Sequence, residues 1–157
     1  MLFMAPIEAG MEKKCKVALT TGVFDIIHPG HIRFLEEAKR LAGRDGRLVV
    51  IVARDIIVRK NKGRMPLFKA RDRALMVSKL KPVDTVYVGR RGDLEKNIEF
   101  FIKKIKPDVI VFGYDQDDVM RKTIKVLERL GLNTKVVKMR KFYNVSSSKI
   151  IGKIKGF

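Results

Sequence analysis

Cysteine, histidine and tryptophan are scarce in this chain of 157 residues, which has one cysteine, two histidines and no tryptophan. The lone Cys15 excludes an intramolecular disulfide and a zinc site built from several cysteines. We expect it to pack as a small apolar residue beside the first strand. No apolar run approaches the length of a membrane-spanning helix. We therefore expect a cytoplasmic protein that has no membrane partner.

Two common phosphate-binding patterns are also absent. The chain contains neither Gly-x-x-x-x-Gly-Lys-Ser/Thr nor Gly-x-Gly-x-x-Gly. No serine or cysteine stands in the strand-to-helix elbow that a nucleophilic triad needs. A nucleotide, if one binds, must be held by a different arrangement.

Acidic residues are few, with 17 Asp+Glu against 35 Lys+Arg, which gives a net charge of +18. Such an excess favours polyanionic partners, namely nucleotides, nucleic acid or an anionic membrane surface. The basic residues are spread through every segment, however, as expected of a solvated surface. The chain lacks interleaved aromatics, Gly-rich RNA motifs and a helix-turn-helix. We therefore do not expect a nucleic-acid-binding module.

The hydrophobic pattern alternates between the two kinds of secondary structure. We expect strands at 16–23, 47–53, 85–88, 109–112 and 134–139, and helices at 29–43, 69–80, 93–104, 118–130 and 146–154. Five alternations predict a single doubly wound, Rossmann-like α/β domain with a five-stranded parallel sheet.

Two segments fall outside this pattern. Residues 59–64, Arg-Lys-Asn-Lys-Gly-Arg, are predicted to form a basic loop because they are charged and interrupted by glycine. Residues 1–14 are predicted to be a poorly ordered lead-in to a domain at 15–157. This lead-in lacks the basic start of a signal peptide, and Met11 is a second candidate for the natural first residue.

The two histidines both lie in the tetrapeptide His28-Pro29-Gly30-His31, directly after the first predicted strand. Pro29 suits the first position of a helix, so His28 becomes the N-cap and His31 lies in the first turn. Gly30 removes a side chain between them and permits close approach to the backbone. The positive end of the helix dipole at this point favours an anion, above all phosphate. Two histidines without a third ligand make a poor metal site, and we predict none.

The stretch from Val23 to His31, Val-Phe-Asp-Ile-Ile-His-Pro-Gly-His, resembles the signature of nucleotidyltransferases that carry a His-x-Gly-His motif. The run Ser146-Ser147-Ser148-Lys149-Ile150 resembles the second signature of that superfamily, which includes cytidylyltransferases and adenylyltransferases. Shorter words resemble the archaeal FAD synthetases, which are FMN adenylyltransferases: Val52-Ala53-Arg54-Asp55, Lys62-Gly63-Arg64-Met65-Pro66, Leu80-Lys81-Pro82-Val83-Asp84 and Gly113-Tyr114-Asp115-Gln116.

The resemblance implies a role for each matching residue. His28, His31 and Lys62 would be catalytic, and the nucleotide would contact a larger set: Gly22, Val23, Phe24, His28, Pro29, Gly30, His31, Lys60, Arg73, Gly113, Tyr114, Asp115, Ser146, Ser147 and Ser148. Within that set, Arg73 would point into the site, residues 113–115 would line the base and ribose pocket, and residues 146–148 would hold pyrophosphate. The motif leaves open whether Lys60 or Lys62 reaches the phosphates.

The resemblance also implies the reaction, in which AMP passes from ATP to the phosphate of FMN, giving FAD and pyrophosphate. The substrates would be ATP and FMN, with Mg²⁺ or another divalent cation, and a homodimer is implied. A cytidylyltransferase that uses CTP and glycerol 3-phosphate or a related phosphoalcohol is the alternative. The serine run here is Ser-Ser-Ser, whereas Ser-Thr-Thr is common at that place in cytidylyltransferases. This difference does not decide between ATP and CTP as the substrate.

Overall fold

The computed structural model describes residues 16–156, so the predicted lead-in at 1–14 and Cys15 lie outside the described residues. Five strands and six helices follow one another in this part of the chain. Their order is β1 (Val17–Gly22), α1 (Pro29–Leu41), β2 (Arg47–Val52), α2 (Asp55–Lys62), α3 (Ala70–Ser78), β3 (Thr85–Val88), α4 (Leu94–Ile105), β4 (Val109–Phe112), α5 (Asp117–Leu130), β5 (Lys135–Lys138) and α6 (Ser147–Lys155).

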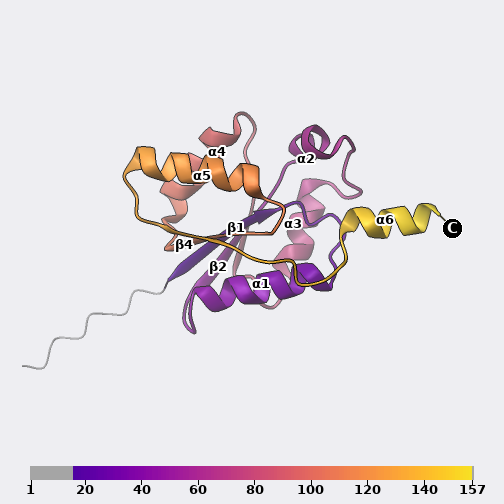
Figure 1. Ribbon diagram of the computed structural model, residues 1–157, viewed down its shortest axis with the longest axis horizontal. Coiled ribbons are helices and arrows are strands. Elements are labelled where there is room, and N and C mark those ends of the chain that lie inside the picture. The colour runs from indigo at the N-terminus through magenta and orange to yellow at the C-terminus, as the bar shows by residue number, and fades with distance from the viewer. Residues whose placement is uncertain (1–15, 157) are drawn as a thin grey trace, which may run out of the picture.

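The five strands form one parallel sheet in the order β3-β2-β1-β4-β5 (Figure 1). β1 lies in the centre and pairs with β2 on one side and β4 on the other. The hydroxyl of Thr20, which is fully buried, donates to the carbonyl of Val111 across the β1–β4 pair at 2.7 Å. The strand order reverses at this pair, so the crevice beyond its carboxyl ends is where such folds bind ligands.

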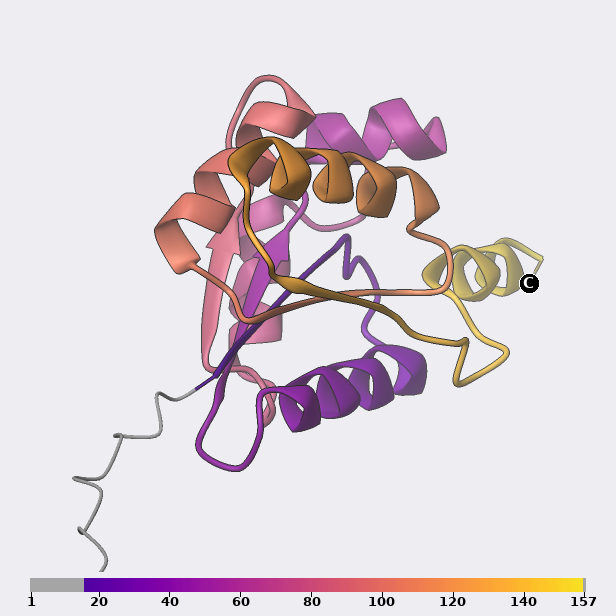
Figure 2. The same ribbon diagram turned by 60° about the vertical axis from the view of Figure 1, so that its left-hand side comes forward.

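Helices cover both faces of the sheet, as the views in Figures 1 and 2 show. On one face α1 and α3 cover a core that includes Ala18, Val50 and Val111. On the other face α4 and α5 cover the alternate strand residues, among them Leu19 and Ile110. The predicted doubly wound α/β domain with a five-stranded parallel sheet is therefore confirmed. Within residues 16–156, no helix has the length and apolar character needed to cross a membrane.

The prediction of a basic loop at 59–64 is wrong, because residues 59–62 form the last turn of α2. Val58 anchors this short helix with only 1% of its surface exposed. Asp55 in the first turn and the cations of the last turn both suit the helix dipole. The helix ends where Gly63 takes a left-handed backbone conformation, with φ of 68°. The charges thus mark the carboxyl end of a helix whose buried residue is Val58.

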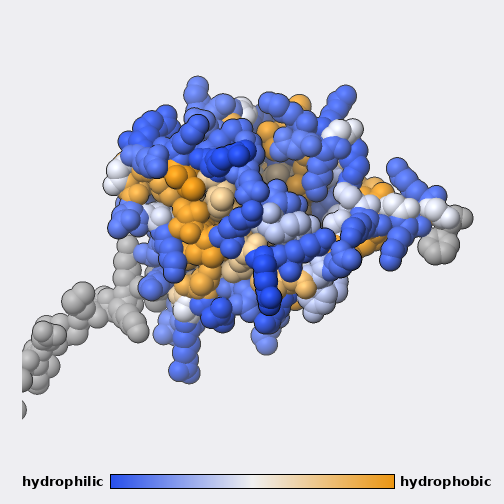
Figure 3. All heavy atoms as spheres, viewed as in Figure 1, coloured by the Kyte–Doolittle hydropathy of each residue, from blue (hydrophilic) through white to orange (hydrophobic). Residues whose placement is uncertain are grey.

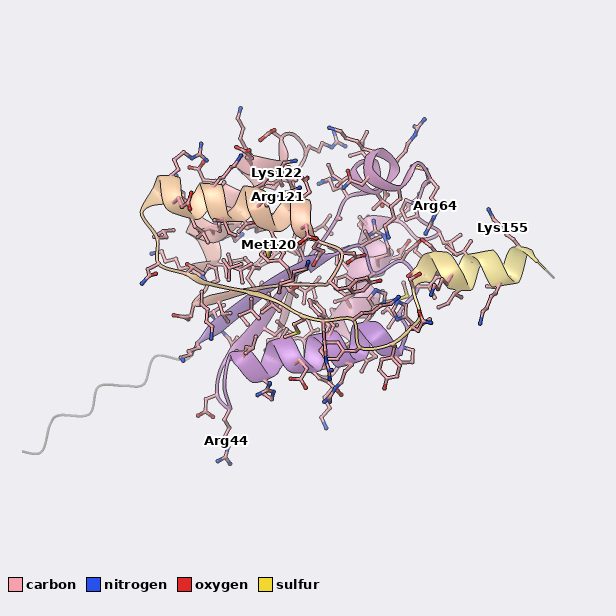
Figure 4. All side chains as sticks on the ribbon, in the orientation of Figure 1. Arg44, Arg64, Met120, Arg121, Lys122 and Lys155 are labelled. Atoms are coloured by element: carbon pink, nitrogen blue, oxygen red, sulfur yellow. The ribbon has the colours of Figure 1, made fainter. Side chains whose placement is uncertain are left out.

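Basic side chains point away from several sides of the molecule. Figure 4 shows Arg44 in the connection after α1, Arg121 and Lys122 on α5, and Lys155 near the end of α6. No single face collects them. This distribution agrees with the interpretation that much of the net charge belongs to a solvated surface.

Candidate active site

The His-Pro-Gly-His tetrapeptide forms the first turn of α1, and His28 is its N-cap as predicted. Nδ1 of His28 accepts a hydrogen bond from the backbone N–H of Gly30 at 3.1 Å. Nδ1 of His31 lies 3.4 Å from the backbone nitrogen of His28, which donates to it. The two rings stack with their centroids 3.8 Å apart. Because each Nδ1 accepts, the hydrogen of each neutral imidazole is on Nε2, and Nε2–H is the donor that each ring offers.

Both imidazoles are neutral at physiological pH. Burial lowers the pKa of His28 below its ordinary value. Burial, with smaller contributions from the nearby His28 and Lys62, lowers the pKa of His31 to about 3, against an opposing effect of the Ile26 backbone. The turn therefore offers uncharged imidazole donors at a helix N-terminus, a place that favours an anion.

The depressed pKa of His31 predicts a loss of stability in mild acid. Below about pH 6.5 the unfolded chain protonates this imidazole, whereas the folded protein does so only near pH 3. The free energy of unfolding should therefore fall as the pH drops between these values, by up to about 1.4 kcal/mol per pH unit from this group. Urea unfolding from pH 7 to 4.5 should show a steeper loss for the wild type than for His31→Asn. Equal slopes would contradict the assignment.

Two glycines make room for aromatic rings in the turn. A Cβ on Gly22 would lie 2.6 Å from the ring of Phe24, and a Cβ on Gly30 would lie 2.9 Å from the ring of His28. Phe24 is buried and has a positive φ of 52°, which turns the chain sharply after β1. The space at Gly30, predicted to admit a ligand to the backbone, is thus occupied by the ring of His28.

The serine run opens α6, as the sequence predicts. Ser146 is the N-cap, and its hydroxyl accepts from the backbone N–H of Lys149 at 3.2 Å. The hydroxyl of Ser147 accepts from the N–H of Ile26 at 3.2 Å and is 3.0 Å from the carbonyl of Ile26, to which it can donate. These contacts join residues 121 positions apart. They fix the N-terminus of α6 against the turn that carries the histidines.

Gln116 joins the carboxyl ends of β1 and β4. Its side-chain Nε2 donates to the carbonyl of Thr21 at 2.9 Å, and its Oε1 accepts from the N–H of Gly113 at 2.7 Å. The sequence places Gln116 in a family-like word but assigns it no function. Gln116 links two strands that are distant in sequence, and no local sequence pattern predicts this role.

A cavity of about 490 Å³ lies at the carboxyl end of the sheet. In Figure 3 a hollow between α5 and α2 exposes recessed apolar atoms among polar ones. The cavity brings together twelve of the predicted site residues: Gly22, Val23, Phe24, His28, Gly30, His31, Lys62, Gly113, Tyr114, Asp115, Ser146 and Ser147. Pro29, Lys60, Arg73 and Ser148 do not line it. Of the two candidate lysines, Lys62 is therefore the one at the cavity.

Arg73 lies in the interior and does not point into the site as predicted. Its side chain has no exposed surface. The guanidinium donates to the carbonyls of Phe68, Val23 and Ala53, and it pairs with Asp55. Arg73 therefore fixes the ends of β1 and β2 and the start of α2, which together form one side of the cavity.

Asp25, a second buried charge, ties the α2–α3 connection to the histidine turn. The carboxylate is 1% exposed and accepts from the backbone N–H groups of Leu67 and Phe68, at 2.8 and 3.3 Å. Its other oxygen lies 3.0 Å from Nη1 of Arg64, which Figure 4 shows in the region between α2 and α6. The sequence alone indicates no role for Asp25, because its partners lie about 40 residues further along the chain.

Comparisons with known proteins place the chain in a family. Residues 19–153 match the family model described as Cytidylyltransferase-like. The chain is 45% identical to the FAD synthase of Methanothermus fervidus over 140 residues, which cover 87% of this chain and 93% of the relative. It is also 45% identical to the FAD synthase of Korarchaeum cryptofilum over 136 residues, with 87% and 89% covered.

Solved structures share the fold. A protein of Thermoplasma volcanium, described as a lipopolysaccharide core biosynthesis protein, is 39% identical and superposes with a TM-score of 0.69 over 82% of this chain and 98% of its own. Thermotoga maritima TmcAL, solved with alpha-thio ATP, has a TM-score of 0.67 at 13% identity over 90% of this chain and 50% of its own, a likeness of fold alone. The chain is thus a nucleotidyltransferase of the cytidylyltransferase-like family and belongs, within that family, to the archaeal FAD synthases.

Proposed function

We propose that this protein transfers AMP from ATP to the phosphate of FMN, giving FAD and pyrophosphate. The observation that carries the proposal is the pair of helix N-termini that meet at one cavity. The α1 terminus holds His28 and His31, and the α6 terminus holds Ser146 and Ser147. Each terminus attracts an anion, and two such sites tied together through Ile26 suit a chain of linked phosphates.

The chemistry requires little beyond orientation and neutralisation of charge. An oxygen of the FMN phosphate attacks the α-phosphorus of ATP and forms the new P–O bond. The bond from the α-phosphorus to the oxygen bridging the α- and β-phosphates breaks, and its electron pair leaves with pyrophosphate. An ionised phosphate needs no general base, so the neutral imidazoles serve as hydrogen-bond donors to the α-phosphate oxygens.

Lys62 and the serines would stabilise the charges at the two ends of the reaction. Lys62 lines the cavity with His31, and its charge lowers the pKa of that imidazole, which supports a role for its ammonium group beside the phosphates. Ser146 and Ser147, which line the cavity at the N-terminus of α6, would hold the departing pyrophosphate. Gly113 and Asp115 would contact the nucleoside, because a carboxylate at the end of a neighbouring strand suits ribose hydroxyls.

A divalent cation would arrive with the nucleotide. Within residues 16–156, no three His, Cys, Asp or Glu side chains are clustered closely enough to hold a metal ion. Mg²⁺ commonly keeps several waters and binds through substrate phosphates with one or two carboxylates. The side chains of this site therefore suit an ion that is bound mainly by the substrate phosphates and that would neutralise their charge.

The direct test is to incubate the protein with Mg²⁺ and each pairing of ATP or CTP with FMN or glycerol 3-phosphate, and to separate the products by chromatography. We expect FAD from ATP and FMN alone. CDP-glycerol as the main product would overturn the proposal in favour of the cytidylyltransferase. The implied homodimer and the cytoplasmic location stay predictions, the first testable by the mass of the protein in solution.

A further inference from the structure

The cavity extends from the histidine turn into a recess on the β2–β3 side of the sheet. Five apolar residues define this recess, and they come from the end of β2, from α2, from the residue after β3, and from α4: Ile51, Ile57, Gly89, Leu94 and Ile98. Figure 3 shows recessed apolar atoms in the hollow between α5 and α2. Such a lining suits a flat apolar ring.

Gly89 leaves space in the recess that the protein does not fill. Ile51 pairs with Tyr87 in the sheet register, so Gly89, two residues after Tyr87, faces the same side as these residues and α4. A Cβ on Gly89 would meet the carbonyl of Val52 at 3.6 Å and Ile51 Cγ2 at 3.9 Å, both ordinary contacts. Neither crowding nor a left-handed backbone requires glycine here, so a side chain at this position would extend into the recess.

Arg54 provides a cation at the edge of the recess. Its Nε donates to the carbonyl of Gly89 at 2.5 Å, which fixes the guanidinium beside the recess. Within residues 16–156, its two Nη groups make no hydrogen bond to protein. The guanidinium therefore retains donors for a polar ligand edge.

No carboxylate lines the recess among the residues that the structure describes, so it offers little to the hydroxyls of a sugar. The amide of Asn97 is already bonded to the backbones of Arg90 and Asp93. The opposite half of the cavity, beside β4, has the exposed carboxylate of Asp115 instead. The two halves thus differ in chemistry: apolar walls with cations on the β2–β3 side, and a ribose-compatible carboxylate on the β4 side.

We propose that this recess binds the isoalloxazine ring of FMN and that Arg54 donates hydrogen bonds to the polar edge of the ring. The proposal rests on the proposed function and adds a site for the acceptor. It fits the reaction geometry, because the attacking and leaving oxygens lie on opposite sides of the α-phosphorus. With pyrophosphate at α6, the FMN phosphate approaches from the side of α2, past Lys62.

Riboflavin tests the ring site, since it has the ring and no phosphate. Its fluorescence changes on binding, which gives a readout independent of turnover. We expect Gly89→Val to weaken riboflavin and FMN about tenfold or more, a loss of about 1.4 kcal/mol, with ATP affinity unchanged within about twofold. Gly113→Val, a matched substitution in the other half, should do the reverse. Its Cβ would also make only ordinary contacts, at 3.4 Å or more.

Two further variants distinguish contacts to the flavin ring from contacts to its phosphate. They also test whether a loss of binding comes from misfolding. Arg54→Leu changes a side chain at the cavity edge and should also weaken both flavins, with at most a small fall in the thermal midpoint from the lost bond to the Gly89 carbonyl. Lys62→Ala should weaken FMN but not riboflavin. Wild-type riboflavin affinity in both Gly89→Val and Arg54→Leu, in an enzyme that still makes FAD, would overturn the ring site alone. A wild type that makes no FAD would instead overturn the proposed function.

Discussion

Replacing His31 with alanine is expected to lower the kcat for FAD formation by about 100- to 1,000-fold and to leave a folded protein. The His31 ring presents its Nε2–H at the N-terminus of α1, stacked on His28. One preorganised donor aimed at developing charge contributes about 3–4 kcal/mol to a barrier. The neutral state of the ring, with its pKa near 3, means that this loss should persist across neutral pH. Steady-state kinetics measure the effect.

Arg33 provides the matched control on the same helix. It is exposed and forms surface ion pairs with Glu36 and Glu37. Arg33→Ala should keep kcat within about twofold, since such pairs contribute about 0–1 kcal/mol. If His31→Ala is folded by circular dichroism and retains wild-type turnover, the role assigned to the histidine turn is wrong.

Replacing Arg73 with methionine is expected to lower the free energy of unfolding by about 3–5 kcal/mol. The buried guanidinium bonds three carbonyls and pairs with Asp55. Methionine keeps much of the side-chain volume but leaves these buried acceptors without partners. A loss of this size is a large fraction of the stability of an ordinary domain. Urea unfolding at low temperature measures it.

Arg71 is the control for this substitution, because it lies on the same helix and is exposed. Arg71→Met should change the stability by less than about 0.5 kcal/mol. If Arg73 instead pointed into the site, as the resemblance implies, Arg73→Met should abolish activity and leave the stability unchanged. An Arg73→Met protein with wild-type stability and no activity would restore that expectation.

Local sequence patterns were sufficient to predict the sheet and the helix starts at the two signatures. A β-branched run such as the one in β2 favours a strand that is buried on both faces. Pro29 after His28 marks a helix start from sequence alone, and the serine run marks another. The structure confirms both starts and shows that they meet, a contact that the resemblance implied and no spacing could establish.

Interactions between distant segments explain what the sequence did not predict. α2 has few apolar residues, and its position depends on the burial of Val58 and on the distant Arg73, so its charged last turn was predicted to be a loop. Arginine is a common ligand of phosphate, and only the buried surroundings of Arg73 show that it holds the fold together and does not bind phosphate. Gln116 and Asp25 act through partners up to 95 residues away. Their roles follow from the assembled fold.

The fate of labelled phosphorus tests the central claim, that the nucleotide is cut between the α- and β-phosphates by attack at the α-phosphorus. With FMN as acceptor, ATP labelled at the α-phosphorus should pass its label to FAD. ATP labelled at the γ-phosphorus should pass its label to pyrophosphate. Label from the γ-position in orthophosphate or in the flavin, with ADP as the other product, would contradict the account, because it would place the attack at the wrong phosphorus.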